Sequence, residues 1–176
     1  MPTPSPSAAL LFLREEELRQ GIELLHFAAR DFAAGLDPLL TAHGLAHSHY
    51  LALHFIARQP QLTVSALVDH LGLSKQSLGR VLDTLIALDL ISQKPGLRDR
   101  RQRLLSLTAA GADLERKLSD HQRTRLAKAY REAGAGAVDG FRKVLLGLVE
   151  GTEERRRFER EERTAQPRLQ TSGRPS

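Results

Sequence analysis

Two short amphipathic segments joined through Gly72 constrain the fold of this chain more than any other feature. Thr63 can cap a helix over residues 64–71, and Ser74 can cap a second helix that runs to about Leu88. Glycine permits the tight turn that two such helices need if they are to pack against each other. The segment therefore predicts a helix-turn-helix, with apolar contacts from Ala66, Leu67, Leu71, Leu73, Leu78, Val81, Leu82 and Leu85.

The second helix of this motif is polar on its other side, close to its start. Lysine and arginine donate to guanine acceptors, glutamine pairs with adenine, and serine bonds to either base. The positive end of a helix is also a site where a phosphate can bind. The candidate DNA-binding residues are Ser74, Lys75, Gln76, Ser77 and Arg80. A helical hairpin with a solvated polar face would give the same pattern, so this motif alone does not decide between the two.

A basic hairpin follows the second helix. Residues 90–94 and 103–107 are expected to be strands, and Pro95-Gly96 begins the exposed tip between them. A loop this basic repels itself unless an anion neutralises it, and arginines just past a recognition helix suit the minor groove. The candidate DNA-binding arginines are Arg98, Arg100, Arg101 and Arg103. Asp99 is expected to orient a neighbouring arginine by a charge-assisted hydrogen bond.

The charge of the chain is concentrated in these two motifs. Seven basic and three acidic residues lie between Ser74 and Arg103, in a chain whose formal net charge is +5. A solvated charge cluster is the alternative interpretation of such a run. Its position directly after a helix-turn-helix favours nucleic-acid binding instead.

From Leu62 to Gly111 the chain resembles the MarR family of winged helix-turn-helix transcriptional regulators. The turn matches through Leu67 and residues 71–74, the wing matches through Asp99 and Arg101, and Leu107-Thr108-Ala109-Ala110-Gly111 follows. The resemblance extends over about residues 15–150. It implies a sequence-specific DNA-binding regulator that works as an obligate homodimer. Such a dimer places two recognition helices about one DNA turn apart on a near-palindromic operator.

The two ends of the chain also carry apolar stripes with helical spacing. One comprises Leu11, Leu18, Ile22, Leu25, Ala29 and Phe32, and the other Phe141, Val144, Leu145 and Leu148. They can be internal core or a dimer interface, and we expect some of each, with dimerisation favoured. The expected fold is mainly α with a small β-hairpin wing, flanked by long helices. The expected domains are a flexible N-terminus (1–7), N-terminal dimerisation helices (8–46), a winged helix-turn-helix (47–108), C-terminal dimerisation helices (109–150) and a charged, partly disordered tail (151–176).

The resemblance further implies a small phenolic or anionic effector, bound between the dimerisation helices and the winged domain, that releases DNA. The candidate pocket residues are Phe27, Arg30, His47, Tyr50 and His54. The last three share one helical face if their helix begins a turn before Ser48. His43 and His47 have the spacing of two zinc ligands on a helix. No cysteine or well-placed carboxylate completes that site, so we expect no metal and no cofactor.

Several function classes are disfavoured by what the sequence lacks. Zero cysteine excludes disulfides, a thiolate zinc site and a thiol redox switch. No apolar stretch approaches the roughly 20 residues that span a bilayer, which favours a cytoplasmic protein without a membrane partner. A Gly-rich phosphate loop and a recognisable catalytic constellation are missing, so we expect no enzyme. RNA binding is disfavoured because aromatics are only 5% of residues. An architectural or protein-interaction module with only non-specific DNA binding stays open.

Overall fold

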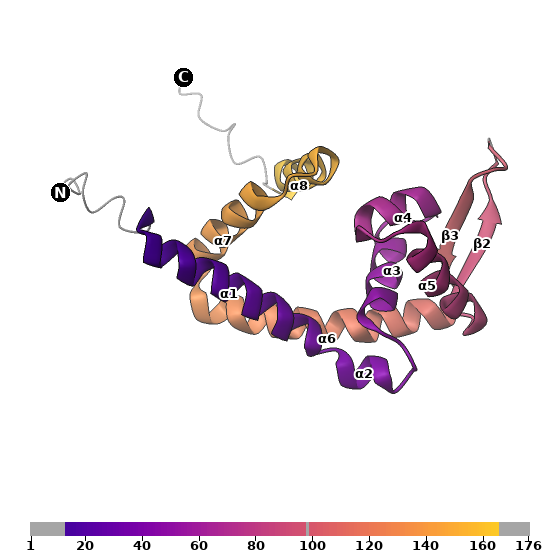
Figure 1. Ribbon diagram of the computed structural model, residues 1–176, viewed down its shortest axis with the longest axis horizontal. Helices are drawn as coiled ribbons and strands as arrows, with labels where there is room; N and C mark the ends of the chain where they lie inside the picture. Colours follow the sequence, from indigo (N-terminus) through magenta and orange to yellow (C-terminus); the bar gives the residue numbers. More distant parts are fainter. Residues whose placement is uncertain (1–12, 98, 166–176) are drawn as a thin grey trace, which may run out of the picture. The chain divides into compact units, whose positions relative to one another are not determined.

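The computed structural model describes residues 13–97 and 99–165, and it folds as two compact units, residues 1–124 and 125–176. The described ranges are mainly helical and contain one small sheet (Figure 1). The helices are α1 (Glu15–Ala34), α2 (Asp37–Thr41), α3 (His47–Arg58), α4 (Val64–Leu71), α5 (Lys75–Ala87), α6 (Ala109–Ala133), α7 (Ala135–Leu148) and α8 (Thr152–Ala165). The strands are β1 (Leu62–Thr63), β2 (Ile91–Pro95) and β3 (Arg103–Leu107). The expected fold class, mainly α with a β-hairpin wing, is confirmed.

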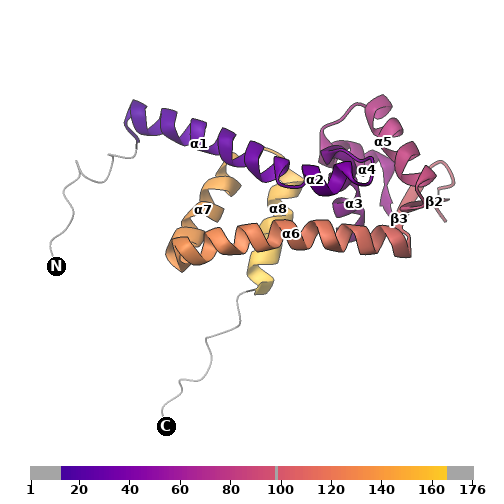
Figure 2. The ribbon, with the colours of Figure 1, turned by 90° about the horizontal axis from the view of Figure 1, so that it is seen from below.

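The helix-turn-helix forms where the sequence predicts it, because both of its helices are capped locally. The Thr63 Oγ1 accepts a hydrogen bond from the Ala66 N–H at 3.1 Å, and the Ser74 Oγ accepts one from the Ser77 N–H at 3.1 Å. Gly72 ends α4 with a φ of +61°, a conformation that glycine adopts without a steric penalty. The helices α3, α4 and α5 gather with the wing strands into one cluster in both views (Figure 1, Figure 2).

The sheet has the strand order β1-β3-β2 and is antiparallel throughout. In the wing, Ile91 pairs with Leu107 and Pro95 with Arg103. The strand β1 pairs Leu62 with Leu105, whose side chain is fully buried. The sequence gives no sign of β1, because a strand of two residues has no periodicity and its partner is more than forty residues away.

A short junction fixes the start of α6 against the wing. The Thr108 Oγ1 donates to the Asp89 carbonyl at 2.6 Å and accepts from the Gly111 N–H at 3.0 Å. A Cβ on Gly111 would lie 1.8 Å from the Leu90 carbonyl oxygen, so only glycine permits this approach. The Leu-Thr-x-x-Gly segment therefore joins α6 to the chain that links α5 and β2.

The N-terminal helix α1 has no buried residue. Its apolar stripe is exposed, and Ile22 keeps 70% of its surface open. A hydrogen bond from the Gln122 Nε2 to the Phe32 carbonyl, 2.9 Å long, joins α6 to the end of α1. Residues 1–12, which include the expected flexible N-terminus, lie outside the described chain. The stripe of α1 therefore has no cover within the described part of its own unit.

The second unit contains the end of α6 together with α7 and α8. Gly134 precedes α7 with a φ of +81°, whereas Gly136 and Gly140 lie within the helix. In the charged tail that we expect to be partly disordered from residue 151, residues 152–165 form α8. Charged pairs four residues apart support this helix, such as Arg155 Nε and Glu159 Oε1 at 3.2 Å. The rest of that tail, residues 166–176, is outside the described ranges. None of the described helices combines the length and apolarity needed to cross a membrane.

Candidate nucleic-acid interface

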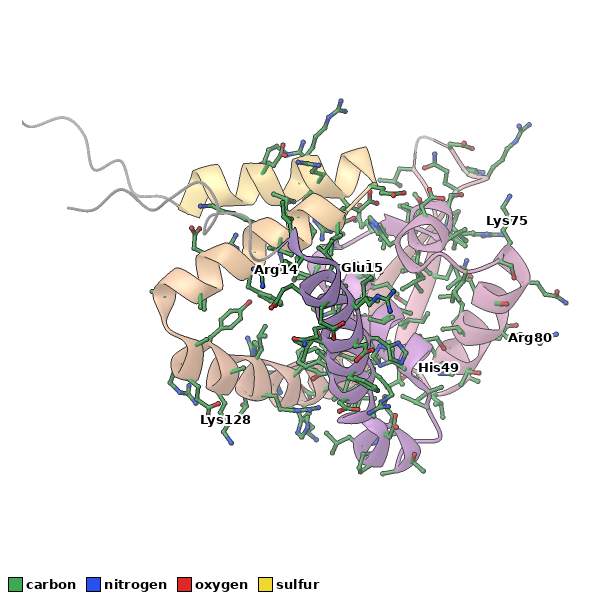
Figure 3. The ribbon with its side chains drawn as sticks, turned by 60° about the vertical axis from the view of Figure 1, so that its left-hand side comes forward. Arg14, Glu15, His49, Lys75, Arg80 and Lys128 are labelled. Atoms are coloured by element: carbon green, nitrogen blue, oxygen red, sulfur yellow. The ribbon has the colours of Figure 1, made fainter. Side chains whose placement is uncertain are left out.

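The exposed side of α5 carries four of the predicted site residues. Leu78, Val81 and Leu85 bury the other side of the helix. Lys75 and Arg80 point away from the body of the molecule (Figure 3), and Gln76 and Ser77 are exposed as well. These polar side chains stand on a rigid, capped helix, which is the form a major-groove reader requires.

The fifth residue of that set, Ser74, is occupied within the helix cap. Its Oγ accepts from the Ser77 N–H and donates to the Ser77 Oγ at 2.9 Å. The hydroxyl of Ser74 therefore has a structural task at the start of α5. The backbone N–H groups of the first turn, which the cap orients, remain the part of this end that suits a phosphate.

The wing tip is held by bonds within the loop. The Gly96 N–H donates to the Gln102 carbonyl at 3.0 Å, and the Gln102 N–H donates to the Asp99 carbonyl at 3.1 Å. Asp99 accepts through Oδ1 from the backbone N–H of Arg101 at 2.9 Å. We expect this carboxylate to orient a neighbouring arginine, and the hydrogen bond described for it goes to the backbone of Arg101. Such a turn is typical of aspartate, whose short side chain reaches the N–H two residues later.

Three of the four predicted wing arginines lie within the described residues. Arg100, Arg101 and Arg103 are exposed. Arg98 is outside the described residues. The wing thus presents cationic side chains on a loop whose backbone is fixed by its own hydrogen bonds.

The helix-turn-helix and the wing border one groove of about 540 Å³. Lys75 from α5 and Arg101 and Arg103 from the wing lie along it, whereas Gln76, Ser77, Arg80 and Arg100 do not. Sequence reasoning missed five polar or small residues of this groove, Ser65, Gly79, Asp83, Gln93 and Gln102. A signal existed for two of them, because Gly79 and Asp83 follow Lys75 at intervals of four residues and so share its side of the helix.

The comparison with known proteins agrees with this geometry. The model of the MarR family matches residues 43–102. Over 141 residues the chain is 51% identical to the HTH-type transcriptional regulator PetP of Rhodobacter capsulatus, covering 80% of this chain and 85% of that protein. The chain belongs to the MarR family. It is a MarR-type transcriptional regulator, as its sequence predicted, and this family is one of regulators rather than of enzymes.

Two solved structures illustrate the fold that this chain shares with known proteins. A complex of NadR with 4-hydroxyphenylacetate matches with a TM-score of 0.65 at 20% identity, covering 85% of this chain and 99% of that one. A mutant MarR from E. coli in complex with operator DNA matches with a TM-score of 0.62 at 21% identity, covering 79% and 98%. At these identities the likeness concerns the fold.

The candidate effector residues of this MarR-family chain fall into two groups. His47, Tyr50 and His54 lie on one face of α3, with 5.8 Å between the ring centroids of each neighbouring pair. The His54 Nδ1 lies 3.2 Å from the Glu115 Oε1 and 3.4 Å from the Ser119 Oγ, both on α6. Burial raises the pKa of the Tyr50 phenol, a hydrogen bond with Ser119 opposes this rise, and the Glu115 charge adds to it. This group is a polar network between α3 and α6 that sequence reasoning found only in part.

Phe27 and Arg30 form the second group. The guanidinium carbon of Arg30 lies 4.8 Å from the centroid of the Phe27 ring, and Arg30 also pairs with Asp31 at 2.8 Å. Both contacts stay on the exposed helix α1. Within the described unit these two residues are therefore not brought into the network of α3.

The histidine pair considered as a zinc site is separated by a turn. The His43 Nδ1 lies 3.0 Å from the Leu39 carbonyl oxygen, and His47 is the first residue of α3. In the part of the chain that the structure describes, no three histidine, aspartate or glutamate side chains are grouped to hold a metal ion.

Proposed function

We propose that this MarR-family regulator binds double-stranded operator DNA as a homodimer, with α5 in the major groove and the wing in the minor groove. The groove between α5 and the wing carries this proposal. It is lined by Lys75 from α5 and by Arg101 and Arg103 from the wing, on surfaces that belong to separate elements. Such a convergence of cations across two fixed elements fits a polyanion that contacts both.

Within this interface the residues have different tasks. Gln76 and Arg80 stand on the exposed side of α5 and read base edges, and Ser77 adds a further hydrogen bond. Lys75 donates to guanine acceptors in the major groove. The wing residues Arg98, Arg100, Arg101 and Arg103 contact phosphates or the minor groove. Ser74 and Asp99 hold the start of α5 and the wing tip in place through the bonds described above. Residues 47–108 are the DNA-binding domain in this proposal.

The dimer follows from the exposed apolar stripe of α1. A helix of 20 residues with no buried side chain gains little from its own chain, so another surface must cover it. We assign that cover to a second copy, through residues 8–46 and 109–150. Two copies related by a twofold axis present two α5 helices, which requires a near-palindromic operator. Operator binding also implies that the protein works in the cytoplasm.

We further propose that a small phenolic or anionic effector releases the DNA. Its site is the network on α3, with His47, Tyr50 and His54, to which Phe27 and Arg30 of α1 are added in the dimer. The network supports this because imidazole and phenol groups lie beside a carboxylate that is 14% exposed, so a competing acid can exchange partners there. The solved complex of NadR contains such a phenolic acid, 4-hydroxyphenylacetate.

The test is selection of binding sites from a random DNA pool, followed by titration of the enriched pool at two salt concentrations. A near-palindromic site bound far more tightly than random DNA supports the proposal. Uniform binding with a steep salt dependence and no enriched site would contradict it. The chain would then be an architectural module that binds DNA without sequence preference.

A further inference from the structure

Gly79 stands in the interior of α5, where glycine is unfavourable. It is the fifth of the 13 residues of the helix, and only proline is a poorer helix former. A Cβ on Gly79 would meet no heavy atom within 4 Å. Packing within the chain therefore does not require glycine here, in contrast to Gly111, where a Cβ would collide with the Leu90 carbonyl.

The open space beside Gly79 lies on the proposed DNA-binding surface. It lines the groove between α5 and the wing, between Lys75 and Asp83 on the same side of the helix. Arg101 and Arg103 border the groove from the wing. The missing side chain is thus a gap in the surface that we propose enters the major groove, and this inference rests on that proposed function.

Helices elsewhere in the described chain also contain glycines with open space around them. Gly21 lies on α1, and Gly136, Gly140 and Gly147 lie on α7. These helices have no buried residues, and we assign them to the dimer interface. Gly79 differs because its helix buries one side within its own chain and presents Gly79 towards the groove.

We propose that Gly79 is a specificity-determining gap that admits the C5-methyl group of a thymine. The thymine methyl is the apolar group that projects from a base pair into the major groove. A glycine Cα offers an apolar surface with room for about one methyl group, whereas any side chain would occupy that room. The flanking Lys75 and Asp83 suit polar neighbours, since lysine donates to guanine and aspartate accepts from the cytosine amino group.

The experiment removes a methyl group from the DNA, adds one to the protein at Gly79, and combines the two changes. The operator selected for the wild-type protein is titrated with single thymine-to-uracil replacements, which remove only the C5-methyl. One such replacement per half-site should weaken wild-type binding about fourfold, the value of one buried methyl. Gly79→Ala should bind the thymine operator about tenfold more weakly, because its Cβ occupies the gap. It should recover most of that loss on the uracil operator.

Two further measurements separate this effect from misfolding and from general damage to the interface. Thermal unfolding of Gly79→Ala should show a raised midpoint, because alanine is the better helix former. Gln76→Ala is the control on the same helix. Uracil in place of the thymine that contacts Gly79 should not restore the DNA binding of this variant. A wild-type protein that is indifferent to every thymine-to-uracil replacement would overturn the inference.

The remaining outcomes are also decisive. Gly79→Ala with wild-type affinity for both operators would overturn the inference, and so would an equal loss on both. In either case a wild-type protein that still prefers its operator leaves the proposed function standing. Absence of any preferred operator for the wild type contradicts the proposed function itself, and the inference about Gly79 falls with it.

Discussion

Helices α1 and α5 have the same apolar periodicity but opposite surroundings. The apolar side of α5 is buried through Leu78, Val81, Leu82 and Leu85. The apolar side of α1 is exposed, and the helix has no buried residue. Periodicity therefore predicts that a face needs cover, but it does not say which chain supplies that cover.

The two helices also differ in how far they are stabilised locally. The Ser74 side chain caps α5, whereas Arg14 at the start of α1 makes no side-chain cap hydrogen bond. The core of α5 comes from elements of its own chain, chiefly α3 and β2. A helix without a cap and without internal packing depends on an outside partner. If this contrast is correct, substitutions on α5 and α1 should have different consequences.

The largest effect is expected in the buried face of α5. Leu85 is fully buried, so Leu85→Ala should lower the free energy of unfolding by about 2–5 kcal/mol through lost burial and the cavity left behind. Urea denaturation followed by circular dichroism measures this. A loss below about 1 kcal/mol would mean that α5 is not part of a tightly packed core.

A charge in the stripe of α1 should act on assembly instead. Ile22→Glu should weaken the dimer by roughly 2–3 kcal/mol, because an apolar side chain leaves the interface and a charge takes its place. Sedimentation at micromolar concentration should then show a monomer that loses helix content from α1, because that helix depends on its partner, while the cluster around α5 stays folded. Gln20→Glu is the matched control, since it adds the same charge on the far side of α1. Dimers of equal strength in both variants would remove α1 from the interface.

A substitution in a base-reading residue of α5 should change DNA specificity but not dimerisation. Gln76→Ala should relax specificity at one base pair per half-site, with a loss of about 1–3 kcal/mol for the preferred base. Titration of operators changed at single positions measures this. The dimer mass should stay that of the wild type, which separates α5 from α1. Unchanged preference at every position would exclude Gln76 as a base reader.

A wing arginine should affect every sequence alike. Arg101→Ala should weaken binding to operator and random DNA by a similar factor, on the order of 1 kcal/mol, because it removes one charge contact. The slope of log affinity against log salt should fall by about 0.9. Lys128→Ala, which removes a cation from α6, should change neither quantity, because the proposal assigns α6 no contact with DNA. A loss confined to the operator would instead make Arg101 a sequence reader.

The predictable parts of the fold are those that local chemistry determines. The helix-turn-helix is predictable from Thr63, Gly72 and Ser74, because each makes its cap or turn with residues at most four positions away. The pairing of β1 with β3 joins residues far apart in sequence, so no local pattern marked it. The helix α8 was missed because a highly charged composition suggested a loose tail, while its pairs at intervals of four support a helix.

The candidate site was predictable to a similar degree. Polar residues on the exposed side of α5 followed from its periodicity. The groove did not, because Gln93 and Gln102 join it only through the wing hairpin. The partners of His54 on α6, Glu115 and Ser119, lie more than sixty residues away. The role of Asp99 beside an arginine stays a prediction, and its hydrogen bond to the Arg101 N–H is the part that the structure describes.

The smallest expected effect is a loss of folding stability at low pH. It should arise in the internally packed region around α5. Burial lowers the pKa of His49 below its ordinary value of 6.5, and its Nδ1 accepts from the Ala46 N–H at 3.0 Å at the start of α3 (Figure 3). The folded protein therefore binds fewer protons at this ring than the unfolded chain. The stability from His49 is complete above pH 6.5 and is lost as the pH falls through the folded pKa.

His49→Asn tests this, because an asparagine oxygen can accept the same hydrogen bond without titrating. Between about pH 7 and pH 5 the wild type should lose more unfolding free energy than the variant. The difference between the two proteins should not depend on protein concentration, since His49 belongs to the cluster around α5. A difference that grows on dilution would place His49 in the assembly supported by α1. Equal pH dependence in both proteins would mean that this ring does not titrate differently on folding.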